Sequence, residues 1–397
     1  MLAVDPSELV ASGAWAAACV RTGTLRRCAG RRTATIHARI LAARGDGTAY
    51  VLKGAVRTAS GQWVFPHVVE RVQVDKALNP RNPRDFQTLV AQARDRLVRS
   101  AARPSEAEAL AAAVPSITAA DWAALDVATA NAVVDVIEAD ILAIAADPRF
   151  ERAFVGLGAR TQSVAAASAR NTVIRGSAGS LSRADRELAM RIGSRRGGVF
   201  LTDEYGRRAA RYGDQAANII ASGAEIGLDS RAIGAELADA LGLAVTGRTA
   251  NYFGVVANAA ISSARSYGEL TSMRDAGLQS YVWISVQDER TSDICGFLDG
   301  QSFPVADSLN RFATADAAPT PEAAIDEFPW YAVSGGTIYA GPRDVPVRDR
   351  TPVARIDTPR SGTGGGSYSQ LTAPQVAPGT PVPPAHGWCR SLLEPEF

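Results

Sequence analysis

The side chains best suited to metal chemistry in this 397-residue chain are Cys295, His386 and Cys389. His386 and Cys389 are three residues apart, so a single turn of chain can bring both to one ion. Thiolate and imidazole suit Zn²⁺, and a zinc site formed by these three residues is one hypothesis that the sequence supports. The fourth ligand would be water or one of three carboxylates, which are Asp288, Asp293 and Asp299.

Three alternatives to a metal remain open for the same residues. Cys295 can pack as a small apolar side chain while His386 hydrogen-bonds to a neighbouring strand. A disulfide between Cys295 and Cys389 is the second alternative and would require an oxidising compartment. A catalytic dyad of Cys295 and His386 is the third, but no local signature of a thiol protease surrounds Cys295. The chain also lacks the motifs of P-loop nucleotide binding, zinc metalloproteases and serine hydrolases.

The residues around Cys295 predict a small unit of strands and one short helix. The segment 281–286 is Tyr-Val-Trp-Ile-Ser-Val, which is typical of a strand, and Trp283 is its largest side chain. A short apolar segment follows at 294–298, and Asp299 with Gly300 indicates a turn. This compact α+β unit must position the candidate ligands.

Asp288 and Arg290 stand two residues apart just after this strand, and alternation places both on one face. We expect these two side chains to pair within the turn, with Thr291 capping the short helix. A catalytic carboxylate at Asp288 is the alternative.

The middle of the chain is predicted to be a helical bundle, because apolar residues recur there at helical spacing. The expected helices are 86–102, 109–114, 119–146, 183–192, 203–223, 231–241 and 247–276. The expected capping residues are Ser105, Thr118, Ser182, Thr202 and Ser230. Asp147 and Pro148 should end the third of these helices.

The remaining segments complete a mainly α fold with a small α+β lobe at the C-terminal end. A short helix is expected around residues 8–20, and turn signals between aromatic and β-branched runs predict a short antiparallel meander. Its strands are expected at 36–42, 50–56 and 63–74, and a helix stays open as the alternative for 36–43 because of its alanines. The expected domains are 1–82 with the meander, 83–277 as the helical region, and 278–397 as the lobe. A Pro/Gly-rich and poorly packed excursion is expected at 306–385, closed by 383–391.

Composition excludes several classes of protein. Hydrophobic residues make up 46% and charged residues 21%, as in ordinary globular proteins, and the net charge is +1. Such a balance gives no overall field that would attract nucleic acid or a membrane. No stretch reaches the roughly 18 apolar residues of a spanning helix, and no signal peptide is recognised at the start. Four cysteines do not form a disulfide framework, so we expect a soluble protein of a reducing cytosol.

Two segments of the chain together resemble a known signature. An aromatic strand is followed by D-E-R-T-S-D-I-C and L-D-G-Q-S-F, and a distant segment contains P-P-A-H-G-W-C-R. This order resembles that of the Mu F-like head morphogenesis (minor head) proteins of tailed phages. The matching residues are Trp283, Asp288, Arg290, Thr291, Cys295, Leu298, Asp299, Gly300, Phe303, Pro383, Pro384, His386, Cys389 and Arg390. The resemblance covers about residues 200–305 and 383–391, and the chain departs from it at Ser292 and Ser391, where the family often has cysteines.

The resemblance implies a structural and assembly protein rather than an enzyme. It implies association with the portal protein and other head proteins at the portal vertex, assembly in the host cytoplasm, a place in the capsid interior of the virion and no membrane partner. Non-specific contact with packaged double-stranded DNA would come from arginines on helix faces. The candidate arginines are Arg191, Arg195, Arg196, Arg207, Arg208 and Arg211.

Two alternative functions stay open. One is a zinc-dependent hydrolase or nuclease, with the Cys and His residues holding the ion and Asp288 as base. The other is a toxin carrier of the same family, with an effector in residues 1–180.

Overall fold

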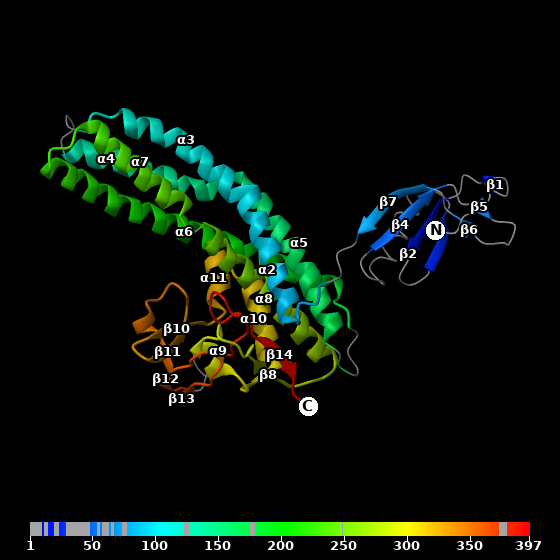
Figure 1. Cartoon of the computed structure of the whole chain (residues 1–397). Coiled ribbons are helices and arrows are strands. Elements are labelled where there is room, and N and C mark those ends of the chain that lie inside the picture. Colours follow the sequence, from blue (N-terminus) through cyan, green and yellow to red (C-terminus); the bar gives the residue numbers. More distant parts are fainter. Residues whose placement is uncertain are drawn as a thin grey trace. The chain divides into compact units, whose positions relative to one another are not determined.

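The structure of the protein is a computed structural model (Figure 1). It describes seven strands within the first 73 residues, and then residues 78–122, 127–172, 174, 179–247, 249–372 and 379–397. The chain divides into two compact units, Met1–Leu78 and Asn79–Phe397. The predicted mainly α fold with a small C-terminal α+β lobe is confirmed.

The first unit contains antiparallel strands, as the sequence predicted. One sheet has the order β3-β2-β4-β7 and the other has the order β1-β5-β6. The strands are β1 (Val10–Ala11), β2 (Trp15–Cys19), β3 (Thr24–Cys28), β4 (Thr48–Lys53), β5 (Val56–Arg57), β6 (Trp63–Val64) and β7 (His67–Gln73). The strand expected at 36–42 lies outside the described residues.

The helix expected around residues 8–20 is wrong, because this segment contains β1 and β2. Strand β2 is a central strand, and it pairs on one side with β3 and on the other with β4. Hydrogen bonding to two neighbours outweighs the helix propensity of Ala16, Ala17 and Ala18. A run of alanines is therefore a weak guide where two strands are available for pairing.

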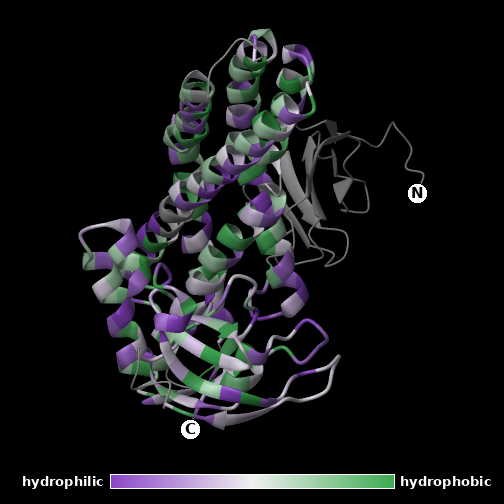
Figure 2. Ribbon diagram, turned by 90° about the vertical axis from the view of Figure 1, so that its left-hand side faces the viewer, coloured by the Kyte–Doolittle hydropathy of each residue, from purple (hydrophilic) through white to green (hydrophobic). Residues whose placement is uncertain are grey.

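The second unit consists mostly of helices. Each long helix contains both hydrophobic and hydrophilic residues (Figure 2). The helices of this part are α2 (Pro83–Leu97), the π-helical η2 (Val98–Ala102), α3 (Arg103–Ala119), α4 (Val127–Ala143), the 3₁₀ turn η3 (Ile144–Ala146), α5 (Pro148–Asn171), α6 (Arg183–Glu225), α7 (Ser230–Thr246) and α8 (Thr249–Asp275). Helices α3, α4, α6 and α7 pack on one another at one end, and α2, α5 and α8 pack near the lobe (Figure 1). None of the described helices combines the length and the apolar character needed to cross a bilayer.

The caps predicted at Ser105 and Thr118 are wrong, since both residues lie inside α3. The hydroxyl of Ser105 donates to the carbonyl of Ala101, and that of Thr118 donates to the carbonyl of Val114. A hydroxyl that bonds to the carbonyl four residues earlier is satisfied within a helix, so its presence does not mark a helix start. Consequently α3 runs on from η2 without a break, and α4 begins later than predicted.

Helices α5 and α6 also differ from the prediction. Helix α5, which begins at Pro148 with Asp147 as its N-cap, was not predicted. Two helices were predicted where α6 is one helix of 43 residues, with Thr202 in its interior. Packing against α4, α5, α7 and α8 stabilises α6 across those of its residues that have low helix propensity. Ser182 caps α6 as predicted, but Asp229 rather than Ser230 caps α7.

Helix α8 lies at the centre of the second unit and is buried on all sides from Val256 to Met273. It contacts α2, α5, α6, α10 and the C-terminal strand β14. Its close approach to α5 depends on Gly268, where a Cβ would overlap the carbonyl oxygen of Ala165 and lie 2.9 Å from the Cβ of Ser168. This central helix connects the bundle to the lobe.

The C-terminal lobe contains two antiparallel sheets. Strands β14 (Leu392–Pro395), β8 (Ser280–Ile284) and β9 (Ser302–Pro304) form the first, in that order. The second has the order β10-β11-β12-β13, from β10 (Trp330–Ser334), β11 (Thr337–Gly341), β12 (Thr351–Thr358) and β13 (Ser367–Gln370). The short helices are α9 (Asp293–Leu298), α10 (Val305–Ala317), α11 (Pro321–Asp326) and the 3₁₀ turn η4 (Val347–Asp349). The strand predicted at 281–286 and the short helix predicted at 294–298 are confirmed.

The expectation of a poorly packed excursion over 306–385 is wrong for its described residues. Helices α10 and α11 and the sheet of β10 to β13 occupy most of it, and Tyr331, Ile338 and Val353 are buried. The strands are short, so the alternation of apolar and polar residues in them is a weak signal. The prediction therefore rested on the Pro and Gly content of the segment.

Gly268→Ala should lower the free energy of unfolding by about 2 kcal/mol, because the added methyl group forces α5 and α8 apart. Gly156→Ala is the matched control, since Gly156 lies in α5 with open space around its Cα. This second change should raise the free energy of unfolding by up to about 1 kcal/mol. Urea denaturation of both variants checks the prediction, and equal effects would contradict it.

Candidate metal centre

Two distant parts of the chain bring three metal-binding side chains together. Cys295 lies in α9, and His386 and Cys389 lie in residues 383–391, here called the closing segment. Nε2 of His386 is 3.0 Å from Sγ of Cys295, and the two sulfur atoms are 3.8 Å apart. The three ligand atoms all lie within 4.8 Å of one another. The predicted cluster of Cys295, His386 and Cys389 is confirmed as a cluster that could hold a metal ion.

The separation of the two sulfur atoms fits two ligands of one tetrahedral metal ion. Two thiolates bound to one Zn²⁺ at about 2.3 Å lie about 3.8 Å apart, which matches the separation of the two sulfur atoms. Cys295 and Cys389 are free thiols rather than a disulfide. His386 contacts Ser292 and Cys295, and not a strand as the metal-free alternative proposed.

The three carboxylates considered as a fourth ligand are bound elsewhere. Asp288 accepts two hydrogen bonds from the Arg390 guanidinium, and Asp293 accepts hydrogen bonds from the Arg360 amide and the Tyr368 hydroxyl. Asp299 accepts hydrogen bonds from the Ser285 amide and the Gln287 side chain. This leaves a hydroxyl or water as the fourth ligand.

The two serines at which the chain departs from the signature both face the cluster. Oγ of Ser292 lies 3.0 Å from Nε2 of His386, and Oγ of Ser391 lies 3.3 Å from Sγ of Cys295. A cysteine at either position would therefore add a sulfur atom beside the three ligands already present.

The two thiols interact strongly. The hydrogen bond with Cys389 and the burial of its own sulfur raise the pKa of Cys295 well above its usual value. Burial also acts to raise the pKa of Cys389, but the hydrogen bond from Cys295 and the nearby His386 outweigh it and lower this pKa. The pair therefore favours one thiolate that accepts a hydrogen bond from one thiol, and a cation would release the remaining proton.

Helix α8 holds the closing segment in place through polar side chains on one of its faces. The Asn258 amide donates to the carbonyls of Gly387 and Cys389, at 3.3 and 3.0 Å. The Arg265 guanidinium donates to the carbonyl of Ser391, and the Ser266 hydroxyl donates to the carbonyl of Pro383 at 3.2 Å. These positioning residues were not predicted from the sequence.

A polar stripe in the Ala-rich sequence of α8 was the available signal for them. Asn258, Arg265, Ser266 and Glu269 recur at intervals of seven, one and three residues, which places them on a single helix face. All four are buried. Buried polar residues with helical spacing indicate that a segment without regular structure docks there, because its backbone needs partners.

Strand β8 and the turns around it hold the other half of the site. Trp283 is fully buried, and the Ser285 hydroxyl donates to the Cys295 carbonyl at 2.7 Å. Gly300 has φ +75, which an L side chain rarely adopts, so the turn after α9 depends on glycine at this position. Asp299 receives the Ser285 amide at 2.7 Å and so connects this turn to the end of β8.

The predicted pair of Asp288 and Arg290 is wrong. Asp288 binds the Arg390 guanidinium through two hydrogen bonds of 2.5 and 2.6 Å, and it receives only the backbone amide of Arg290. The predicted cap is also wrong, since Ser292 caps α9 and the Thr291 hydroxyl bonds to the Val286 carbonyl. A two-point contact with a guanidinium 102 residues away fixes a carboxylate better than the exposed side chain of Arg290 would.

The cluster is almost closed to solvent. Cys295 and Cys389 are 4% and 0% exposed, and the opening that leads to them has a volume of only about 10 Å³. Structural zinc sites are closed, whereas catalytic ones keep a position open to substrate. The geometry therefore describes a closed site between α9 and the closing segment.

Four of the six arginines expected to face DNA have partners within the chain. Arg191 pairs with Asp316, and Arg195 donates to the carbonyls of Ala315, Asp316 and Ala318. Arg208 is fully buried with Glu106 and Glu204, so the prediction is wrong for it. Arg207 is 62% exposed and pairs with Glu204.

Comparisons with models of protein families, with curated proteins and with solved structures give no match. Interpretation of the cluster therefore depends on its own geometry and on the motif residues that form it. The motif residues around the cluster lie in α9, in β8 and the turns beside it, and in the closing segment.

Asp288→Asn should remove a stabilising ion pair whose strength depends on pH. The hydrogen bonds from Arg390 lower the pKa of Asp288 to about 2, so the pair stabilises the fold above about pH 4 and is lost as pH falls towards 2. The Asp288 side chain is 30% exposed, and with solvent screening the effect is on the order of 1 kcal/mol. Urea denaturation of metal-free protein from pH 7 to pH 2 measures the difference from the unmodified chain.

The control for this experiment is Glu289→Gln, a change at the exposed neighbouring residue. It should leave the free energy of unfolding at pH 7 within about 0.5 kcal/mol. A difference between Asp288→Asn and the unmodified chain that stays constant down to pH 2 would contradict the assignment of Arg390 as the partner.

Proposed function

We propose that this chain is a minor head protein of a tailed phage, a structural component that binds the portal protein and other head proteins at the portal vertex. In this proposal it assembles in the host cytoplasm, lies in the capsid interior of the virion and makes non-specific contact with packaged double-stranded DNA. The proposed role is one of assembly and not of catalysis.

The observation that carries the proposal is the convergence of the two signature segments. Cys295 lies 91 residues before His386 in the chain, yet their side chains are 3.0 Å apart. Arg390, also part of the signature, binds Asp288 of the first segment. Residues that are separated in sequence and share a signature are expected to share a site, and this agreement supports the resemblance to minor head proteins.

We further propose that the cluster binds Zn²⁺. The donor set consists of two thiols and one imidazole, which suit zinc, and the two buried sulfur atoms are 3.8 Å apart. When bound, zinc would supply a cross-link between α9 and the closing segment. The chain's own residues already prepare the site, because Ser292 caps α9 and Asn258 holds the backbone around Cys389.

The hydrolase or nuclease alternative has less support. Asp288 is its proposed base, but the ion pair with Arg390 lowers its pKa to about 2 and occupies both carboxylate oxygens. General bases work best with a pKa near the operating pH. The opening to the cluster, at about 10 Å³, is also too small for a scissile bond to reach the ligands.

Purified protein should contain about one zinc ion per chain, measured by plasma mass spectrometry. Cys389→Ser should reduce the zinc content at least tenfold, since it removes a buried thiolate. Cys28→Ser is the control, because it removes a thiol in β3 that belongs to the other unit. Equal zinc in the Cys389→Ser variant and in the unmodified chain would exclude Cys389 as a ligand.

Ser292→Cys provides a test in the opposite direction. A sulfur atom at this position replaces a hydroxyl 3.0 Å from His386 and would complete a four-ligand site. Competition with a chromogenic chelator should show tighter zinc binding by at least tenfold. Unchanged affinity would contradict the placement of Ser292 beside the ion.

Co-expression with the portal protein encoded near its own reading frame tests the assembly role. The chain should elute with the portal ring in size-exclusion chromatography and remain bound after a second column. Elution of the chain alone, with a folded portal ring in the same sample, would contradict association with the portal. Zinc content is measured on the same fractions, so the two proposals are judged separately.

A further inference from the structure

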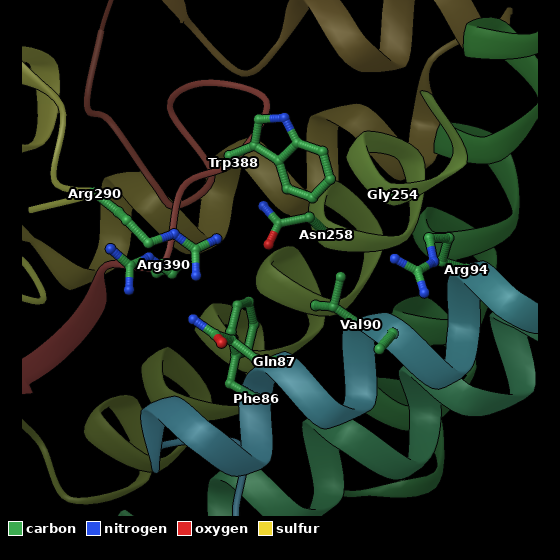
Figure 3. Close-up of a pocket in the computed structure, with 10 residues that line it drawn as sticks. Phe86, Gln87, Val90, Arg94, Gly254, Asn258, Arg290, Trp388 and Arg390 are labelled. Atoms are coloured by element: carbon green, nitrogen blue, oxygen red, sulfur yellow. The ribbon is translucent and has the colours of Figure 1, made fainter. Parts of the chain in front are cut away.

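A pocket lies between α2, α8 and the closing segment, next to the Cys/His cluster but outside it. It has a volume of about 160 Å³ and is here called the Trp388 pocket. Figure 3 shows Trp388 on one side, Phe86 and Val90 on the opposite side, and Arg290 with Arg390 at one end. Gln87, Ala91, Arg94, Gly254 and Asn258 complete the lining. Of these residues the metal proposal uses only Asn258, through its hydrogen bonds to the closing segment.

The charged groups of the pocket are all cationic. Its lining contains three arginines and no carboxylate. Arg390 is paired with Asp288, and Arg94 is paired with Asp95. The side chain of Arg290 is exposed and has no hydrogen bond or ion pair with another described residue. The pocket therefore presents an uncompensated positive charge beside an apolar floor.

Trp388 connects this pocket to a second groove. The indole is 47% exposed although it packs directly on Gly254, where any Cβ would overlap the ring. Trp388 also lines a groove of about 640 Å³, whose charged residues are Arg207 and Arg211 together with Glu204 and Asp214. Trp and Arg are the residues most enriched at the energetic centres of protein interfaces. A half-exposed Trp between two hollows is suited to a ligand that extends across both.

We propose that the Trp388 pocket is the docking site for an acidic segment of a partner protein. In this arrangement one aliphatic or aromatic side chain of the segment enters the pocket, and a neighbouring carboxylate binds Arg290. A volume of about 160 Å³ accommodates a side chain but falls below the roughly 300 Å³ at which pockets begin to enclose a whole small-molecule ligand. Charge complementarity selects an acidic segment over a basic one.

The docked segment would also cover the entrance to the Cys/His cluster. Arg290, Trp388 and Arg390 line both the Trp388 pocket and the small opening that leads to Cys295. Occupation of the pocket therefore restricts access of solvent and oxidants to the thiols. The proposal does not depend on the identity of the protein as a head component, because it uses only the shape and charge of this surface.

A library of random twelve-residue peptides displayed on yeast, selected on the full-length protein, tests this proposal. Enriched peptides should carry at least two acidic residues beside one large apolar residue. A synthetic copy of the most enriched peptide is then titrated by fluorescence anisotropy, and its affinity should fall at least fivefold between low salt and 0.5 M salt, because exposed charges are screened. Enrichment without an acidic bias, or no enrichment at all, would overturn the proposal.

Point variants locate the binding. Arg290→Glu and Ala91→Phe should each weaken the peptide at least tenfold, the first by charge reversal and the second by filling the pocket. Arg348→Glu is the control, since its side chain is 87% exposed and lies outside the pocket, and it should leave the affinity unchanged. If Ala91→Phe fails to fold, Arg290→Glu alone decides, because its side chain supports no described contact.

Competing ligands complete the test. A peptide with lysines in place of its acidic residues should bind Arg290→Glu more tightly than the unmodified chain. Inorganic phosphate at about 10 mM should not displace the acidic peptide. A twelve-nucleotide oligothymidine should not displace it either. Displacement by oligothymidine at lower concentration than the peptide itself would assign the surface to nucleic acid and overturn the proposal.

Discussion

The structure depends on the hydrogen bonds between the buried face of α8 and the backbone of the closing segment. This segment has no regular ladder of its own between residues 383 and 391, so its carbonyl groups need donors from elsewhere. Asn258, Arg265 and Ser266 provide them. These donors satisfy carbonyl groups that would otherwise be buried without partners, and they help to place His386 and Cys389 beside Cys295. The candidate metal centre thus depends on the polar side chains that α8 presents to the closing segment.

Two side chains of α8, those of Glu269 and Arg265, are charged and fully buried, which limits how the helical bundle and the lobe can pack together. Glu269 binds Arg81 at 3.3 Å and accepts the Leu393 amide, and burial raises its pKa. Arg265 stacks over the Phe86 ring, 4.1 Å from its centre. A buried ion pair contributes little net stability, because the cost of desolvation offsets the attraction between its charges. A buried charge that loses its partner, however, strongly destabilises the fold. We therefore infer that these groups favour a single docking of the lobe over many similar ones.

Sequence patterns predicted the elements that are dominated by one local preference. Strand β8 is rich in aromatic and β-branched residues, and α8 has a long helical periodicity, so both were predicted within a few residues. Ser105 failed as a cap because its hydroxyl has a partner inside the helix. The cluster itself followed from residue types and the resemblance. Its supports did not, because the Arg390 partner of Asp288 and the α8 donors are separated from their acceptors by more than 100 residues.

The length of α6 has a mechanical consequence. A continuous helix of 43 residues has a contour of about 65 Å, and it packs against α4 and α7 as well as against α10 and α11 beside the lobe (Figure 1). A helix that is packed along its course changes little in length under load. The surfaces near the two ends of α6 are therefore held at an almost constant distance. A binding partner that contacts both surfaces would have to match that distance.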